Sequence, residues 1–447
     1  MSIFAPEFVE TPYWWDAAKP EALAGDEPGN STPTDVIVIG SGYAGLSCAL
    51  ELARAGTEVL VVDAGEIGIG ASTRAAGLLS GRAGISKQIN LEAQVGAARS
   101  AAMLDEADEA YDHFQQIVTS PTARDAGFQR TGRFVAAHTP AAYEKLAIEA
   151  EEYNSDGRGA FKMVPRDEQH AYIASDFYFG GMYTDAAGLV HPALYHRVLL
   201  DACRAAGVHF ASHCRVTAIS RAQGKCCLAT ERGSLEAHDV VLATNGYTDS
   251  AAPWHQRRLI PISSTMVASA PLGRDAVAKL LPKGCAVIDA KRVIAFARPS
   301  PDGTRLLFGG RARFHPTTLH EATNILHAQM REILPELADV QVTHAWTGKM
   351  GFTFDFLPKI GEHQGIHYAL GCNGGCGIVM MTWLGREVGR KLAGTTNRTS
   401  AFDNQHFKTQ PFYAGKPWFL PVVGNYYRFR DWLELRGARR FRNAATR

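Results

Sequence analysis

The sequence lacks long apolar runs and has almost no net charge, and both absences exclude classes of function. No apolar stretch approaches the ~20 residues that a membrane span requires. The chain has 46 Lys and Arg against 45 Asp and Glu, so no charge excess points to nucleic acid or to an anionic surface as partner. The N-terminal segment from Met1 to Glu7 lacks the basic and apolar regions of a signal peptide, so we expect a cytoplasmic protein.

The eight cysteines contain no C-x-x-C pair, so neither a zinc site nor a redox dithiol has its usual spacing. Cys226 and Cys227 are adjacent, which is a poor arrangement for either role. We therefore expect reduced and mostly buried thiols, and no metal site.

A nucleotide-binding pattern is present between residues 34 and 63. The apolar run at 36–39 predicts a buried strand, residues 40–45 read Gly-Ser-Gly-Tyr-Ala-Gly, and helical spacing follows over 46–55. A second apolar strand at 59–62 completes a β-α-β unit with the G-x-G-x-x-G spacing of dinucleotide sites. The alternative is a glycine-rich turn that binds nothing, but strands, glycines and helix all agree with a site.

Each part of this motif has a role in holding a pyrophosphate and a ribose. Gly40 permits the tight turn, Gly42 lets the backbone approach the pyrophosphate, and Gly45 lets the helix pack on the strand. The helix N-terminus offers free N–H groups to the phosphates. Asp63, 18 residues after Gly45, is placed to accept hydrogen bonds from the ribose diol, and its charge makes NADP the poorest candidate.

The segment after Asp63 differs from that of an NAD domain, which normally continues into another helix. Residues 64–77 are rich in Gly and Ala, and Ser72 and Thr73 precede Arg74. Such a chain suits a path close along a long ligand.

Five stretches of the sequence resemble the FAD-dependent D-amino-acid oxidase superfamily. They are residues 12–15 (Pro-Tyr-Trp-Trp), 35–77, 188–192 (Gly-Leu-Val-His-Pro), 240–248 (Val-Val-Leu-Ala-Thr-Asn-Gly-Tyr-Thr), and 346–361 with the glycine cluster after it. Within the superfamily the chain is most similar to the gamma-glutamylputrescine oxidoreductase-like branch, with glycine and sarcosine oxidases as more distant relatives. That branch usually has Asn-Gly after the arginine, where this chain has Ala75-Ala76.

The resemblance implies an α/β fold: a discontinuous Rossmann-like FAD-binding domain and an α+β substrate domain built on an antiparallel sheet. The length of 447 residues also exceeds one ordinary core. We expect an N-terminal arm and linker over 1–33, FAD-binding parts over 34–90, 185–250 and 346–395, substrate-domain parts over 91–184 and 251–345, and a basic aromatic tail over 396–447.

The second substrate-domain part has the pattern of an antiparallel sheet with one helix. Strands are predicted over 263–269, 293–297 and 306–310, with a Pro-Asp-Gly turn at 301–303. An amphipathic helix is predicted over 318–333.

A second strand–turn–helix is predicted at residues 368–392, and its helix N-terminus suits the side of the flavin ring that becomes anionic on reduction. The resemblance implies FAD contacts from Gly40, Gly42, Tyr43, Ala44, Gly45, Asp63, Ala64, Gly70, Ala71, Ser72, Thr73, Arg74, Val216, Thr244, Asn245, Gly246, Gly371, Asn373, Gly374, Gly375, Cys376, Gly377 and Ile378. Some relatives attach FAD through a cysteine, but the matching position falls near Lys349. We therefore expect dissociable FAD, with Cys372 and Cys376 keeping attachment as the alternative.

Three cations are candidates for catalytic contact with substrate. Lys349 lies in the segment that passes along flavin and substrate in the family. Arg298 and Arg311 lie on or near the predicted substrate sheet, where a guanidinium can hold a carboxylate through two hydrogen bonds. The alternatives are solvent exposure for the lysine and structural ion pairs for the arginines. His191 precedes Pro192 at a helix start, where we expect capping or packing rather than catalysis.

The resemblance implies oxidation of an amine or amino acid by hydride transfer to flavin N5, giving an imine that water hydrolyses. The cofactor supplies this chemistry, so the missing Ser-His-Asp triad and metal cluster do not count against an enzyme. The alternatives are an FAD hydroxylase, an FAD hydroxy-acid dehydrogenase, or an FAD-bearing subunit of a larger dehydrogenase complex. The expected partners are the small amine or amino acid and an electron acceptor, with a homo-oligomer left open.

The identity of the electron acceptor stays open at this stage. Several oxidases of the superfamily place a lysine over the flavin to help oxygen react, and the matching position lies near Phe308. The run 306–310 has no lysine, which favours another acceptor. Lys349 or Arg311 can supply the charge from another direction, which favours oxygen.

The tail from Pro411 to Arg447 is basic and aromatic. Its last twenty residues hold seven arginines, partly countered by Asp431 and Glu434. We expect a helix packed on the body by its aromatic side chains, with the arginines solvated or at a subunit contact. Contact with RNA or a membrane and docking of an electron acceptor are the alternatives.

Overall fold

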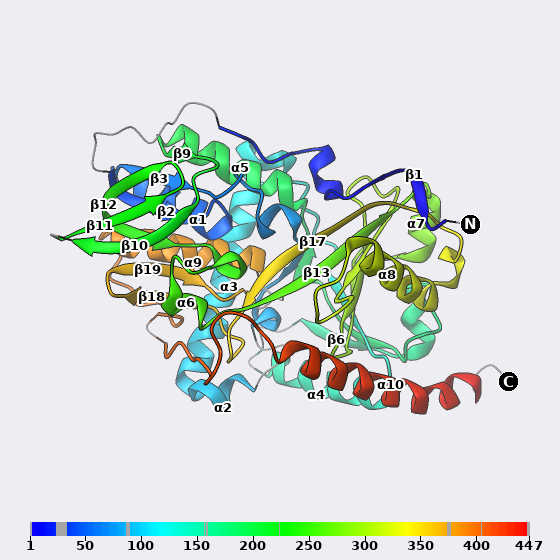
Figure 1. The fold of residues 1–447 in the computed structure, drawn as a ribbon. Helices are drawn as coiled ribbons and strands as arrows, with labels where there is room; N and C mark the ends of the chain where they lie inside the picture. Colours follow the sequence, from blue (N-terminus) through cyan, green and yellow to red (C-terminus); the bar gives the residue numbers. More distant parts are fainter. Residues whose placement is uncertain are drawn as a thin grey trace.

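The computed structural model describes residues 2–23, 34–85, 90–155, 157, 160–222, 224–372, 377–403 and 405–444. Two large sheets form two lobes, seen on the left and right of Figure 1. Residues 24–33, which end the predicted arm and linker over 1–33, lie outside the described residues. Within the described ranges, no helix is long and apolar enough to cross a membrane.

The first lobe contains an eight-stranded sheet in the order β10-β11-β12-β2-β3-β9, with β19 beside β12 and β18 beside β19. Its strands are β2 (Thr34–Ile39), β3 (Val59–Val62), β9 (His209–Ala211), β10 (Val216–Ala222), β11 (Lys225–Thr230), β12 (Gly233–Leu242), β18 (Lys359–His363) and β19 (Ile366–Leu370). The pairs β12–β2, β2–β3, β3–β9 and β12–β19 are parallel.

The central strands β2 and β3 are buried on both faces, as their apolar runs predict. Alternate side chains pack toward helices on one side and toward the β10–β12 meander on the other. The helices of this lobe are α1 (Tyr43–Arg54), α3 (Ala97–Thr119), α5 (Pro192–Ala205) and α9 (Gly377–Leu392), with the short α2 (Leu91–Val95) before α3. A Cβ at Gly385 would lie 2.1 Å from the Ala44 carbonyl oxygen, so glycine allows α9 to cross α1 closely.

The second lobe contains a nine-stranded, largely antiparallel sheet in the order β1-β17-β13-β16-β15-β14-β5-β7-β6. Its strands are β1 (Phe4–Val9), β5 (Arg133–Ala136), β6 (Phe161–Val164), β7 (Gly181–Thr184), β13 (Ile260–Ser269), β14 (Ala286–Asp289), β15 (Ala295–Pro299), β16 (Leu306–Gly310) and β17 (Val342–Phe352). The helices α4 (Pro140–Asn154), α6 (Pro253–Gln256), α7 (Arg274–Leu280) and α8 (Leu319–Ile333) and a two-stranded sheet of β4 (Leu78–Ser80) and β8 (Ala187–Leu189) complete the fold.

Two segments differ from the predicted division of the chain. The N-terminal arm is part of the body, because β1 pairs with β17 and the Trp14 indole is fully buried. Its Nε1 donates to the Ala75 carbonyl oxygen at 2.9 Å. Residues 346–352, expected in the third FAD-binding part, belong to β17 of the nine-stranded sheet.

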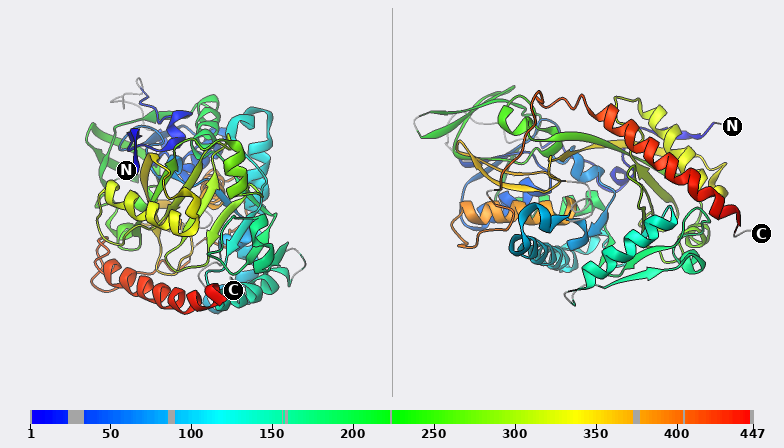
Figure 2. Two further views of the ribbon diagram at one scale, coloured as in Figure 1. Left: turned by 90° about the vertical axis from the view of Figure 1, so that its right-hand side faces the viewer. Right: turned by 90° about the horizontal axis from the view of Figure 1, so that it is seen from below.

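The tail forms α10 (Leu420–Ala444), which runs along the second lobe as the red helix of Figure 2. The predicted packing by aromatic side chains is wrong for Tyr426, Phe429 and Trp432, which are 53%, 56% and 49% exposed. Small or acidic residues face the body instead, at positions 424, 431 and 438. Seven-residue spacing places these on one side of a helix and leaves the aromatics on the other.

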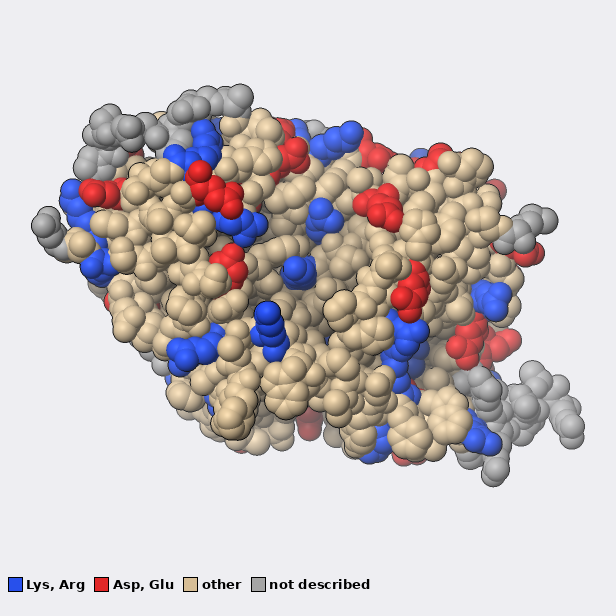
Figure 3. Space-filling view, in the orientation of Figure 1, with Lys and Arg blue, Asp and Glu red and all other residues tan. Residues whose placement is uncertain are grey.

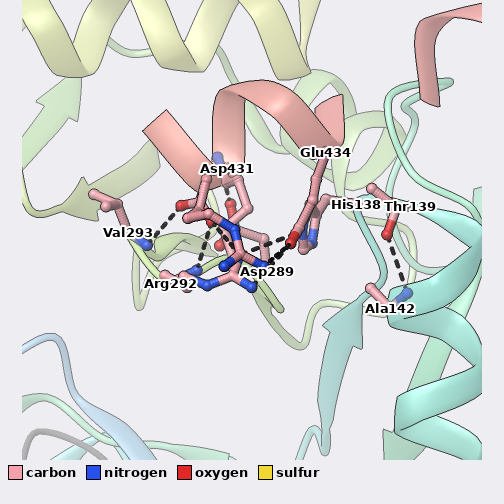
Figure 4. A network of polar contacts seen from close by, with 10 residues as sticks. His138, Thr139, Ala142, Asp289, Arg292, Val293, Asp431 and Glu434 are labelled. Atoms are coloured by element: carbon pink, nitrogen blue, oxygen red, sulfur yellow. Dashed lines mark hydrogen bonds and ion pairs between the residues drawn. The ribbon is translucent and has the colours of Figure 1, made fainter. Parts of the chain in front are cut away.

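The two acidic residues of α10 anchor the helix to the turn between β14 and β15 (Figure 4). Arg292 Nη1 lies 3.1 Å from Asp431 Oδ1, and Arg292 Nη2 lies 2.9 Å from Glu434 Oε1. The Val293 N–H donates to Asp431 Oδ2 at 2.9 Å, and His138 Nε2 lies 3.3 Å from Glu434 Oε2. Glu434 Oε1 also lies 4.0 Å from Arg430 Nη2 of the same helix, so these acids counter the tail's own arginines in part, as expected.

Candidate active site

A cavity of about 960 Å³ lies between the two sheets. One wall consists of the carboxyl ends of β2, β3 and β12, where ligands of open parallel sheets bind. The opposite wall is the face of the nine-stranded sheet that carries Ser264, Met266, Ile288, Ile294 and Phe296.

Backbone contacts require glycine at two positions of the G-x-G-x-x-G run, and a side-chain contact crowds the third. Gly40 has φ +104°, and a Cβ there would lie 2.9 Å from the Ala243 carbonyl oxygen. A Cβ on Gly45 would lie 1.9 Å from the Gly40 carbonyl oxygen, so Gly45 lets α1 pack on the turn. A Cβ on Gly42 would lie 2.9 Å from Ser72 Oγ, which accepts a hydrogen bond from the Tyr43 N–H.

Asp63 holds the glycine turn from the end of β3. Its Oδ2 accepts from the Ser41 N–H at 2.9 Å and from Ser41 Oγ at 2.6 Å, and its Oδ1 accepts from the Gly65 N–H at 3.1 Å. A carboxylate has about four acceptor positions, so one stays available to a ligand hydroxyl. His196 Nε2 lies 2.7 Å from the Ser41 carbonyl oxygen, and burial lowers the pKa of this histidine.

Arg74 braces the loop at the cavity wall. Its Nε donates to the Ile69 carbonyl oxygen at 2.9 Å, and its Nη1 donates to the Thr347 carbonyl oxygen at 3.2 Å. The guanidinium lies 4.5 Å from the centroid of the Trp15 ring. These contacts give Arg74 a bracing role in the loop and explain part of the burial of the N-terminal arm.

Asn245, whose φ is +43°, holds the chain directly after β19. Its Oδ1 accepts from the Gly371 N–H at 3.0 Å and from the Cys372 N–H at 3.3 Å. Gly377 and Ile378 bring the N-terminus of α9 to the cavity. The predicted contacts Asn373, Gly374, Gly375 and Cys376 lie outside the described residues.

Most of the other predicted FAD contacts also line the cavity. The full set is Gly40, Gly42, Tyr43, Ala44, Asp63, Ala64, Gly70, Ala71, Ser72, Arg74, Val216, Thr244, Asn245, Gly246, Gly377 and Ile378. Gly45, Thr73 and Gly371 are not among the lining residues and act by positioning others. The Thr73 hydroxyl, for example, donates to the Gly68 carbonyl oxygen at 2.7 Å.

Arg298 does not reach the cavity, in contrast to its predicted contact with substrate. It is 1% exposed, and its Nη1 donates to the carbonyl oxygens of Ala76, Gly77 and Val190 at 2.9–3.1 Å. Burial lowers its pKa to about 9. The guanidinium therefore fixes the chain beside β4 and β8 and is not aimed at a ligand.

Arg311 does line the cavity, just beyond the end of β16. It is 8% exposed, its guanidinium lies 4.9 Å from the Phe352 ring centroid, and its Nε has no hydrogen-bond partner among the described residues. Burial lowers its pKa to about 10, which still leaves it charged at neutral pH. An anionic ligand would satisfy this group.

Lys349 is exposed at the same cavity, and its Nζ lies 5.7 Å from the centroid of the Tyr247 ring. Phe308, near which the resemblance led us to look for a lysine, is buried in the core on the other side of the sheet. Its neighbour Gly309 has no room for a side chain, since a Cβ would lie 2.4 Å from the Phe296 ring. Lys349 and Arg311 are therefore the candidate cations on this side of the cavity.

Residues 35–390 match the family described as FAD dependent oxidoreductase. The chain belongs to this family. FAD is the cofactor of the enzyme, and the close-packed glycine turn, Asp63 and the cavity between the sheets fit a dinucleotide of this size. The predicted family, fold class and cofactor are confirmed.

The chain is similar to several known proteins over most of its own length and of theirs. It is 28% identical to the gamma-glutamylputrescine oxidoreductase of Escherichia coli K12, over 91% of this chain and 95% of that one. It is 27% identical to the probable oxidoreductase OrdL of Haemophilus influenzae, over 89% and 92% of the two chains. The crystal structure of glycine oxidase from Geobacillus kaustophilus superposes with a TM-score of 0.69 at 21% identity, over 85% of this chain and 99% of that one.

Sequence reasoning missed several residues that line this oxidoreductase's cavity or support its glycine turn. Ser41 and His196 support the glycine turn, and Met266, Ile288 and Phe296 form the sheet wall. The alternation of side chains along the strands could have indicated which residues form this wall together, because residues two apart share a face of a sheet. Which face borders the cofactor depends on how the two sheets meet. The charged groups on the face seen in Figure 3 are interspersed in sign.

Proposed function

We propose that this FAD dependent oxidoreductase oxidises an amine or an amino acid at the carbon that carries the nitrogen. Bound FAD would supply the hydride-accepting chemistry; the iminium ion left by the substrate would lose a proton to solvent, and the resulting imine would be hydrolysed by water. The names of two relatives support the substrate class, since one is a gamma-glutamylputrescine oxidoreductase and another a glycine oxidase.

The observation that carries the proposal is the buried guanidinium of Arg311 at the cavity. A buried charge without a partner is costly, and a substrate carboxylate would remove that cost through charge-assisted hydrogen bonds. Lys349 at the rim offers a second cation to an acid group or to the reacting acceptor. Arg311 and Lys349 are therefore our proposed substrate contacts.

Other groups of the chain orient the reactants and exclude water. The apolar side chains of Met266, Ile288 and Phe296 would cover the substrate side and favour the neutral amine. The N-terminus of α9 would stabilise negative charge that develops on the ring, by about 0.3–2 kcal/mol. Asp63 and the glycine turn would hold the ribose and the pyrophosphate.

The test is anaerobic bleaching of the yellow protein by candidate substrates. The panel contains polyamines, N-methyl amino acids, D-amino acids and, for the competing dehydrogenase hypothesis, 2-hydroxy acids. Bleaching by a nitrogen compound and not by its hydroxy analogue supports amine oxidation, and the reverse result contradicts it. Turnover by the isolated chain with an artificial acceptor would contradict the hypothesis that the active site lies in a partner subunit.

The role of Arg311 is tested with Arg311→Met and Arg311→Lys. If Arg311 binds a carboxylate, Arg311→Met raises KM for amino acids by about tenfold to a hundredfold, and Arg311→Lys restores part of the loss. Amines without a carboxylate keep their KM in both variants. Equal losses for both substrate classes would contradict this role.

A further inference from the structure

A second pocket of about 180 Å³ adjoins the main cavity, and Ser80 and Arg133 line both. One side of this pocket is a face of α3 that presents Asp108 and Tyr111, three residues apart. The other side is formed by terminal residues of β4, β5, β6 and β7. The pocket therefore lies where the two lobes meet, next to the cofactor cavity.

Two buried polar atoms at this pocket lack hydrogen-bond partners among the described residues. Arg133 is 5% exposed, and its Nε is unpartnered although its Nη1 donates to Ser80 Oγ. Tyr111 is 7% exposed, and its hydroxyl is unpartnered. Unsatisfied buried groups are rare in native proteins, and two at one pocket point to a ligand that satisfies both.

The charges around the pocket favour an anion. Asp108 forms an ion pair with Arg82, whose Nε lies 3.1 Å and 3.2 Å from the two carboxylate oxygens. Asp112 and Arg130 are exposed at the rim, where water screens them. No carboxylate in the described ranges hydrogen-bonds Arg133, and Glu149 acts on its charge without a hydrogen bond or an ion pair.

We propose that this pocket binds a carboxylate-sized oxyanion, held by the guanidinium of Arg133 and the hydroxyl of Tyr111. The anion has two sources with the same chemistry. It is the distal acid group of a long substrate that reaches past Ser80 from the main cavity, or a free small anion. The anion site itself does not depend on the proposed function. Only the assignment of the anion to the distal acid group of a substrate rests on it.

The first experiment measures binding of free anions without turnover. The thermal unfolding midpoint of the FAD-loaded protein is followed with acetate and with sulfate, against chloride at equal ionic strength. A ligand of the native state raises the midpoint in a saturable way, and chloride controls for general salt effects. We expect a saturable rise that Arg133→Met abolishes and Tyr111→Phe weakens by roughly fivefold to tenfold in apparent Kd.

Tyr111→Phe keeps the test decisive if Arg133→Met does not fold. The variant removes only an unpartnered hydroxyl, so in chloride it should unfold at the wild-type temperature or above. Arg130→Gln at the exposed rim is the matched control and should leave the anion effect nearly unchanged.

The second experiment separates the two sources through the visible spectrum of the bound flavin. Dicarboxylates of increasing length are compared with the corresponding monocarboxylates. If the site takes the far end of a substrate, a long dicarboxylate perturbs the spectrum at a lower concentration than its monoacid, and Arg133→Met removes this advantage. A free-anion site raises the unfolding midpoint and leaves the spectrum unchanged. If neither experiment distinguishes the wild-type protein from Arg133→Met and Tyr111→Phe, the proposal is wrong.

Discussion

Ser41 donates both its backbone N–H and its hydroxyl to one carboxylate oxygen of Asp63, at 2.9 Å and 2.6 Å. The Ser41 hydroxyl in turn accepts from the Gly68 N–H at 2.9 Å. This pair ties the glycine turn after β2 to the end of β3 and to the loop that follows. The acid that is expected to bind the ribose therefore also shapes the turn that is expected to bind the pyrophosphate.

Replacing Asp63 should weaken FAD binding, because it removes the expected ribose contact and also loosens the glycine turn. We expect Asp63→Ala to cost about 1.5–3 kcal/mol of binding free energy, the usual value of a hydrogen bond to a charged group. This corresponds to roughly tenfold to more than a hundredfold in Kd. Fluorescence titration of the apoprotein with FAD measures the change. A Kd within a factor of two of the wild-type value would contradict the assignment, and Ser41→Ala should have a smaller effect.

The backbone at Gly42 should tolerate no side chain without loss of FAD. A Cβ there would lie 2.9 Å from Ser72 Oγ, and a valine would also fill space along the cavity wall. We expect Gly42→Val to be folded by circular dichroism but colourless after purification. Gly437→Ala serves as the control because nothing lies within 4 Å of its Cβ position. A yellow Gly42→Val protein would show that the fingerprint is misassigned.

FAD should be released by acid precipitation. The family resemblance implies that covalent attachment would use a cysteine, and the matching position falls near Lys349 and not at a cysteine. The absorbance of the supernatant and pellet at the flavin bands measures this directly. Cys372 lines the cavity, so it is the first residue to replace if flavin stays with the pellet. Retention of colour by wild-type protein and its loss in Cys372→Ser would establish covalent attachment instead.

The stability of the protein should fall below neutral pH, in part because of His191. This residue caps α5 through Nδ1, which accepts from the Leu194 N–H at 3.2 Å, as expected from its position before Pro192. Burial, with the charge of Arg298, lowers its pKa from 6.5 to about 4. The folded state therefore binds fewer protons than the unfolded state, and its stability is lost as pH falls from 6.5 towards 4.

The contribution of His191 is measured with His191→Asn, which keeps a capping residue but removes the titration. We expect urea unfolding with saturating FAD to show a flatter decline between pH 6.5 and 4, by at most about 3 kcal/mol. The other buried histidines contribute equally to the pH dependence of the unfolding free energy in both proteins, so the difference between the two curves isolates His191. His320→Asn is the exposed control. Parallel pH curves for wild-type protein and His191→Asn would contradict the expectation.

The tail helix should influence the Arg311 end of the cavity. A Cβ on Gly424 of α10 would lie 2.2 Å from the Phe314 ring, and this ring lies 5.9 Å from the Arg311 guanidinium. We expect Gly424→Leu to displace Phe314 and to raise KM for carboxylate-bearing substrates several-fold, with little change for simple amines. Gly437→Ala on the same helix should leave both unchanged. A change in kcat alone would contradict a positioning role.

The sequence by itself determined the local elements and the nucleotide turn. Four apolar residues before Gly40 define β2, the glycine spacing defines the turn into α1, and Asp63 marks the end of β3, because these features depend only on residues close in the chain. The same holds for α8, which begins after the capping residue Thr318. Family resemblance then identified FAD, because the loop over 64–77 carries contacts that are local in sequence.

Only the tertiary structure decided which of two similar arginines faces the cavity. Arg298 and Arg311 both lie at the substrate sheet. Arg298 donates its hydrogen bonds to carbonyl oxygens of segments distant in the chain, whereas Arg311 lies just beyond its strand and lines the cavity. The outward aromatics of α10 have the same origin, since the anchor at Arg292 fixes which helix face turns inward. Such choices depend on contacts between residues far apart in the chain, and neither periodicity nor spacing encodes them.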